Sequence, residues 1–172
     1  MSRCLFLLLM AMLVCGCKGE DPRRHFEKEG GFSYVPPEGW ALQAPTGKIA
    51  DDKGRQFHSA VEPRPAGSAA VLAVFEDRAV PGTVSDYVRQ QRSMLERSYG
   101  WRVLKEDVFT AESGLQGMRL TVQDPASGIR QTFYFFPKGQ AKIVVNCVAP
   151  AGRHEELAAV FEAALKTMRF DP

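Results

Sequence analysis

Four runs of β-type sequence follow one another in the second half of the chain, separated only by short connections. The runs cover residues 101–109, 115–123, 129–136 and 141–149. Each connection is four or five residues long and contains a glycine. Connections this short join antiparallel neighbours, because parallel neighbours need a crossover of about a dozen residues or more. The second half therefore predicts an antiparallel meander.

Two amphipathic helices accompany these strands. The first is predicted to begin after Thr83, which forms a capping box with Asp86, and to end at Gly100, while the second covers residues 153–167. Each has an apolar stripe at i, i+3 and i+4 spacing. The stripes consist of Val84, Tyr87, Val88, Gln91, Met94, Leu95 and Ser98 in the first helix, and of Leu157, Val160, Phe161, Ala164, Leu165 and Met168 in the second. Sheet faces are the only apolar surfaces large enough to bury these stripes.

The first half adds four further β-type runs, at residues 32–35, 40–43, 57–62 and 70–75, the last of them apolar throughout and expected inside the sheet. The elements thus follow the order strands, helix, strands, helix. This order predicts an α+β fold in which an antiparallel β-sheet is flanked by two main helices. A 172-residue chain that is 45% hydrophobic and 24% charged fits one such globular domain. The predicted core contains Trp40, Leu72, Val74, Phe133, Phe135, Val145, Cys147, Leu157, Phe161 and Leu165.

The N-terminus carries an export signal. One positive residue, Arg3, precedes an unbroken apolar run from Cys4 to Val14. Eleven helical residues at about 1.5 Å each cannot cross a hydrocarbon core of about 30 Å, so the run is typical of a signal peptide and not of a permanent membrane helix.

The residues that follow, Val14-Cys15-Gly16-Cys17, resemble a bacterial lipobox. The resemblance implies that Cys17 takes a diacylglycerol and that residues 1–16 are removed. It also implies that the protein lies in the cell envelope, anchored to the extracytoplasmic face of the outer or cytoplasmic membrane. Cys15 is the competing lipidation site, although Val14 would then stand where the pattern wants a small residue. An ordinary signal peptide with incidental cysteines, or an uncleaved anchor, is the other alternative.

The chain then divides into a tether at 17–31 and a single domain at 32–172. Within the tether, residues 18–31 contain four basic and four acidic side chains and only one large apolar one, Phe26, which predicts a solvated segment. A short helix over residues 23–29 is the alternative.

The start of the domain carries a second resemblance. Residues 31–40, GFSYVPPEGW, resemble the opening of PsbP-like and DcrB-like proteins, and the order of elements agrees up to Phe170. The resemblance implies an α/β/α sandwich with a non-enzymatic accessory or binding role. It carries over no ligand residues.

Catalytic residues are sparse. His58, with Glu62 nearby, is a candidate general base, although an edge-strand histidine usually faces solvent. Cys147 lies in the apolar run from Ile143 to Val148, where a cysteine is usually an inert core residue. We expect no catalytic site, and a hydrolase using His58 or Cys147 is the alternative.

Metal and cofactor motifs are also missing from the sequence. His25, His58 and His154 lack the spacing of a zinc site. The pair Asp51-Asp52 lies between glycines but has no closing Glu, so a solvated loop is favoured over a cation site. We expect neither metal nor cofactor.

Charge limits the class of partner. The formal net charge of +2 argues against a nucleic-acid-binding protein. Arg89, Arg92 and Arg97 are expected on a solvated helix face, with contact to anionic headgroups or a partner protein as the alternative. The sequence thus predicts a membrane-tethered accessory or binding module with a possible envelope protein partner, a structural subunit of an envelope assembly being a further alternative.

Overall fold

The computed structural model describes residues 20–43, 54–64, 69–78 and 81–170. Ten strands and two α-helices occur in these ranges. The first strands are β1 His25–Glu27, β2 Phe32–Tyr34, β3 Trp40–Gln43, β4 Arg55–Pro63 and β5 Val71–Asp77. Helix α1, Val84–Tyr99, then precedes β6 Arg102–Thr110, β7 Gln116–Asp124, β8 Ile129–Lys138 and β9 Ala141–Pro150. The 3₁₀ turn Ala151–Arg153, helix α2 His154–Lys166 and β10 Arg169–Phe170 are the last elements of the described ranges.

Seven strands form one antiparallel sheet in the order β3-β4-β5-β9-β8-β7-β6. Strands β6 to β9 form the predicted meander, and β5 joins it by pairing with β9, where Val74 lies opposite Val145. The strands β1, β2 and β10 form a separate three-stranded sheet. The predicted run at residues 32–35 therefore belongs to the small sheet and not to the main one.

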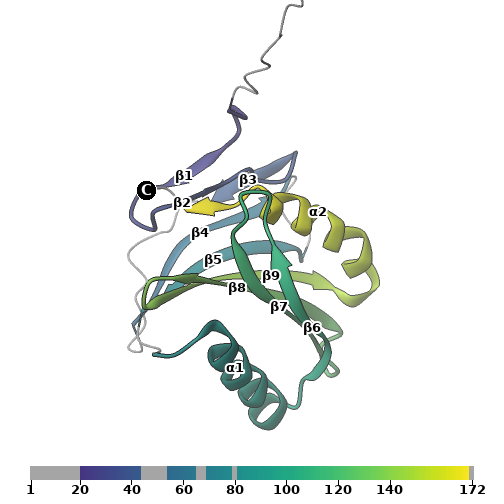
Figure 1. The fold of residues 1–172 in the computed structure, drawn as a ribbon. Helices are drawn as coiled ribbons and strands as arrows, with labels where there is room; N and C mark the ends of the chain where they lie inside the picture. Colours follow the sequence, from purple (N-terminus) through teal and green to yellow (C-terminus); the bar gives the residue numbers. More distant parts are fainter. Residues whose placement is uncertain (1–19, 44–53, 65–68, 79–80, 171–172) are drawn as a thin grey trace, which may run out of the picture.

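The helices cover opposite faces of the main sheet (Figure 1). On one face, α1 packs with Leu120, Val122 and Phe135. On the other face, α2 and the small sheet enclose a larger cluster that includes Phe32, Tyr134 and Phe161. The result is the predicted α+β fold with a sheet between two helical layers.

The predicted core is largely confirmed. Eight of the ten residues are buried: Leu72, Val74, Phe135, Val145, Cys147, Leu157, Phe161 and Leu165. Trp40 and Phe133 are only partly buried and pack against the edges of the two clusters. Trp40 begins strand β3, which is an edge strand of the sheet. Phe133 lies on β8 and lines a hollow beside α1, so the helix does not cover its ring completely.

The ends of α1 follow the sequence signals. Thr83 Oγ1 accepts a hydrogen bond from the backbone N–H of Asp86, and the Asp86 carboxylate accepts one from the backbone N–H of Thr83. Gly100 takes the left-handed conformation at φ 67°, which its missing Cβ allows without strain. The predicted capping box and C-terminal glycine are therefore confirmed.

The segment before the domain differs from the prediction. Residues 25–27, expected in a solvated tether, form β1 and pair with β2. Arg24 Nη1 also donates a 3.0 Å hydrogen bond to the carbonyl of Thr167, and Glu20 forms an ion pair with Arg169. The alternative of a short helix over residues 23–29 is wrong. Neither α1 nor α2 has the length and apolarity that crossing a membrane requires.

Candidate binding cleft between α1 and the sheet

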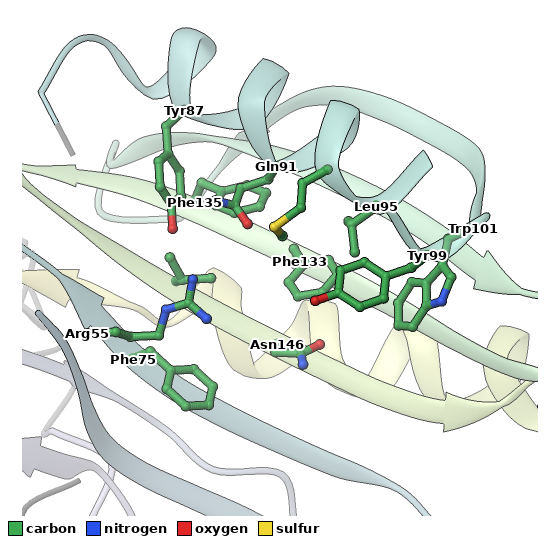
Figure 2. Close-up of a pocket in the computed structure, with 12 residues that line it drawn as sticks. Arg55, Phe75, Tyr87, Gln91, Leu95, Tyr99, Trp101, Phe133, Phe135 and Asn146 are labelled. Carbon is green, nitrogen blue, oxygen red and sulfur yellow. The ribbon is translucent and has the colours of Figure 1, made fainter. Parts of the chain in front are cut away.

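A cleft of about 260 Å³ lies between α1 and the main sheet. Helix α1 packs over β6, β7 and β8, which leaves the neighbouring parts of β5 and β9 uncovered on this face. The cleft lies along the boundary between the part of the sheet that α1 covers and the part that it leaves uncovered (Figure 2). It is lined by Arg55, Phe75, Tyr87, Gln91, Met94, Leu95, Tyr99, Trp101, Phe133, Phe135, Val144 and Asn146.

Aromatic rings make up much of the lining. Phe133 and Phe135 stack with ring centroids 6.0 Å apart, and Tyr87 meets Phe135 edge to face at 5.6 Å. Tyr99 lies 6.4 Å from Trp101, and its side chain is 62% exposed. Exposed aromatic surface of this kind is characteristic of sites that bind other molecules. The polar group of the side chain remains hydrated while the apolar face of its ring is available for packing.

One end of the cleft is polar and charged. Arg55 Nη2 lies 3.8 Å from Oδ2 of Asp77, and the Tyr87 hydroxyl donates a 2.8 Å hydrogen bond to the same carboxylate oxygen. Burial, together with the Asp77 carboxylate, raises the pKa of Tyr87 well above its ordinary value, so the phenol stays protonated. Asp77 is buried and the Arg55 side chain is 42% exposed, so the cation lies toward solvent and the anion beneath it.

Asn146 places an amide in the apolar surface of β9. It lies opposite Phe133 on β8 and Ala73 on β5. Its Oδ1 atom is buried and accepts no hydrogen bond from any residue that the structure describes. A buried acceptor without a donor costs about 1–3 kcal/mol, so a donor supplied at this point would be favourable.

The histidine predicted to face solvent is buried instead. His58 lies on β4, which is the second strand of the sheet and not its edge, and only 3% of its surface is exposed. Its Nε2 atom lies 3.1 Å from Oε2 of Glu76, and its Nδ1 atom 3.9 Å from Oε1 of Glu27. The expectation of a solvent-facing His58 is therefore wrong. The pairing of β4 with β5 shifts register between Phe57 and Ser59, and His58 lies at this shift, directed inward beneath the small sheet.

Cys147 is completely buried, as predicted. Burial raises the pKa of its thiol well above the ordinary value, which opposes formation of the nucleophilic thiolate. Cys147 belongs to the cluster under α2, on the face of the sheet opposite the cleft. Neither Cys147 nor His58 lines the cleft.

The remaining candidate residues do not converge. His154 is buried and its Nε2 atom lies 3.0 Å from Thr132 Oγ1, whereas His25 lies in β1. Asp51 and Asp52 fall outside the described residues. Within the described ranges, no group of three or more His, Cys, Asp or Glu side chains is arranged to hold a metal ion.

The basic side chains of α1 lie on its solvated face, as expected. Arg89 pairs with Asp86 at 3.0 Å, and Arg92 pairs with Glu106 at 3.2 Å. The Arg89 side chain is 76% exposed. None of Arg89, Arg92 and Arg97 lines the cleft.

Sequence reasoning did not identify the cleft as a site. Its lining comes from three separate parts of the chain, β4 with β5, α1 with Trp101, and β8 with β9, so no local motif marks it. Two signals were present: Gln91 within the apolar stripe of α1, and Asn146 within the apolar run of β9. Both are polar residues at positions where the pattern calls for core residues.

Solved structures share this fold at low sequence identity. The cyanobacterial PsbP protein CyanoP of Synechocystis aligns with 14% identity over 91% of this chain and 98% of its own, with a TM-score of 0.61. LpqN of Mycobacterium tuberculosis, involved in cell envelope biogenesis, aligns with 13% identity over 82% of this chain and 83% of its own, with a TM-score of 0.55. The Ran-binding protein Mog1p of Saccharomyces cerevisiae aligns with 12% identity over 86% of this chain and 94% of its own, with a TM-score of 0.54.

Comparison with models of known protein families finds no match. Comparison with curated protein sequences finds none either. The structural match to CyanoP shows that the fold is that of PsbP-like proteins, as the motif at residues 31–40 implied. At this level of sequence identity the likenesses concern the fold alone.

Proposed function

We propose that this protein is a lipid-anchored binding module of the cell envelope and that the cleft between α1 and the sheet is its binding site. The observation that carries the proposal is the cleft itself: an aromatic-lined hollow with an arginine at one end and an amide in its wall. Small-molecule sites have this composition, mostly apolar with a few placed polar groups.

The same geometry argues for binding and against hydrolysis. A hydrolase needs a nucleophile and a base within hydrogen-bond reach of each other and of the substrate. The two candidates for those roles, His58 and Cys147, are buried on the opposite face of the sheet from the cleft. The lining of the cleft supplies hydrogen-bonding groups and an ordered cation, which suit recognition.

The lipid anchor at Cys17 fits the start of the described structure. Glu20 is only three positions after Cys17, and it already contacts Arg169. Three residues span at most about 10 Å. An anchored domain would therefore lie directly beside the bilayer, with the small sheet nearest to the lipid. LpqN, which shares the fold, is a protein of cell envelope biogenesis, and this agrees with an envelope location.

The binding role is tested by photocrosslinking in intact cells. Tyr99 at the rim of the cleft is replaced by p-benzoylphenylalanine, and Ala159, which is exposed on α2, is replaced in a matched control. After irradiation the protein is recovered and its mass is measured. We expect a defined adduct from position 99 and none from position 159. Equal adduct yields at the two positions would contradict a binding role for the cleft.

The anchor is tested by Cys17→Ser, with Cys15→Ser as the matched control. The first change should leave an uncleaved precursor without a diacylglycerol and release it from the membrane fraction, whereas the second should alter neither property. Retention and continued lipid labelling of the Cys17→Ser protein would assign the modification to Cys15 or reveal a different anchor.

A further inference from the structure

We infer that the cleft takes a small aromatic carboxylate whose ring also carries a hydrogen-bond donor. This assignment deepens the proposed function of the same cleft and depends on it. Three properties of the described residues support it: the size of the cleft, the charge at one end, and the acceptor in its wall.

Size favours a molecule of one or two rings. A volume of about 260 Å³ lies just under the usual range of about 300–1,000 Å³ for small-molecule sites. An acyl chain of membrane-lipid length or a folded peptide segment would not fit within it. The rings of Phe75, Phe133 and Trp101 offer faces and edges against which a flat ligand can pack.

Charge favours a carboxylate on that ligand. The Arg55 guanidinium lies between the rings of Tyr87 and Phe75 at one end of the cleft (Figure 2). Because Asp77 lies beneath it and is buried, Arg55 is held in place and an entering molecule meets the cation first. Planar guanidinium groups recognise carboxylates through paired hydrogen bonds, and the same cation disfavours a positively charged ligand.

The acceptor in the wall favours a donor on the ring. Asn146 Oδ1 is buried among apolar neighbours, and no described residue donates to it. In Figure 2, Asn146 lies below Phe133 and Tyr99, away from Arg55. A ligand with a carboxylate at one end and a ring N–H toward the other would complement both groups.

Binding of three matched probes to the full-length protein tests the inference. Calorimetric titrations in non-ionic detergent, with empty micelles as the reference, compare indole-3-acetate, naphthalene-1-acetate and indole. The second probe lacks the ring N–H and the third lacks the carboxylate. We expect indole-3-acetate to bind about tenfold more tightly than either, since one buried hydrogen bond or ion pair contributes roughly 1–1.5 kcal/mol.

Two variants assign the contacts. Asn146→Leu should weaken indole-3-acetate about tenfold and leave naphthalene-1-acetate unchanged, which a general loss of structure would not do. Arg55→Gln should weaken both acids and leave indole unchanged. Arg64→Gln, at the exposed position just after the end of β4, is the control for lost charge and should change no affinity. Thermal melts of each variant confirm that it folds.

Two results would overturn the inference. Equal affinities for the three probes, unaffected by the variants, would show unspecific apolar uptake. No binding of any probe, together with a protein adduct from position 99 in the crosslinking experiment, would make the occupant a side chain of a partner protein. That second result would leave the binding role of the cleft intact, whereas absence of both probe binding and adduct would remove the binding role as well.

Discussion

The Nε2 atom of His58 lies 3.1 Å from Oε2 of Glu76, and both side chains are buried. Glu76 also accepts from Arg78 at 3.1 Å and from Lys138 at 3.4 Å. Strands β4 and β5 are thereby linked to the end of β8 beneath the small sheet. A histidine and a carboxylate this close can look like part of a catalytic triad, but here the pair is enclosed within the fold and serves its stability.

Glu76→Gln should lower the free energy of unfolding by about 2 kcal/mol, because it removes the anion to which the three donors bind. Burial alone would raise the pKa of Glu76, but hydrogen bonds from Arg78 and His58, with the charge of Lys138, hold it below its ordinary value. The stabilisation is therefore present above about pH 4.3 and is lost as the pH falls through the folded-state pKa. Chemical denaturation at pH 7 and at pH 3.5 measures both effects. Glu38→Gln, in an exposed turn, is the matched control, and an equal loss in both variants would contradict this role.

Protonation of His154 should destabilise the protein below about pH 6.5. Burial, and then the positive charge of Arg130, lower the pKa of His154 in the folded chain. As the pH falls below 6.5, the unfolded chain takes up a proton that the folded chain resists, so stability present above this pH is lost. His154→Gln should flatten the slope of unfolding free energy between pH 7 and pH 5. His25, whose pKa is also lowered by burial, accounts for a remaining slope, and an unchanged slope in the double variant would refute the assignment.

Phe161→Ala should lower the free energy of unfolding by roughly 3–5 kcal/mol. Phe161 is fully buried on α2, and its ring meets Trp40 edge to face at 5.6 Å. The substitution leaves a cavity between α2 and the first strand of the main sheet. Urea denaturation followed by tryptophan fluorescence reports on the loss directly, because Trp40 is one of two tryptophans. Ala163→Ser, exposed on the same helix, should change stability by less than about 0.5 kcal/mol.

Gly117→Ala should destabilise the meander by about 1–3 kcal/mol through overpacking. A Cβ at this position would lie 2.4 Å from the carbonyl oxygen of Phe135 and 2.7 Å from the ring of Phe136. Backbone on the neighbouring strand cannot give way as a flexible side chain can. Gly152→Ala is the matched control, because a Cβ there meets nothing within 4 Å. Similar melting temperatures for the two variants would show that β7 and β8 separate more easily than this spacing indicates.

Local patterns predicted most of the elements correctly. The capping box at Thr83 and Asp86 and the glycine at position 100 placed α1, because these signals act within one or two turns of helix. Alternation in the second half placed β6 to β9 to within two residues. Strand β1 was missed because residues 25–27 contain two charged or titratable side chains in three positions, and it is pairing with β2 that orders them.

Properties that depend on neighbours far along the chain were not predictable. His58 was expected at an edge because nothing in residues 57–62 shows that β3 pairs outside β4. The cleft requires α1 to stop short of β5, which is set by how the helix sits across three later strands. Asn146 is a single polar residue in an apolar run of sequence, and its place in the cleft lining depends on Phe133 and Tyr99, which the fold brings to the same cleft.

The pairing of β5 with β9 has a consequence for the order of folding. Strands β6 to β9 are joined by short loops and pair through local hairpin contacts, whereas β5 must find β9 across the whole of α1 and the meander, which is the slower kind of pairing. Until it does, β9 is an open edge that carries Ile143, Val144 and Val145. Unpaired apolar edges recruit other chains. Newly made copies are thus most prone to self-association before the two halves of the main sheet meet.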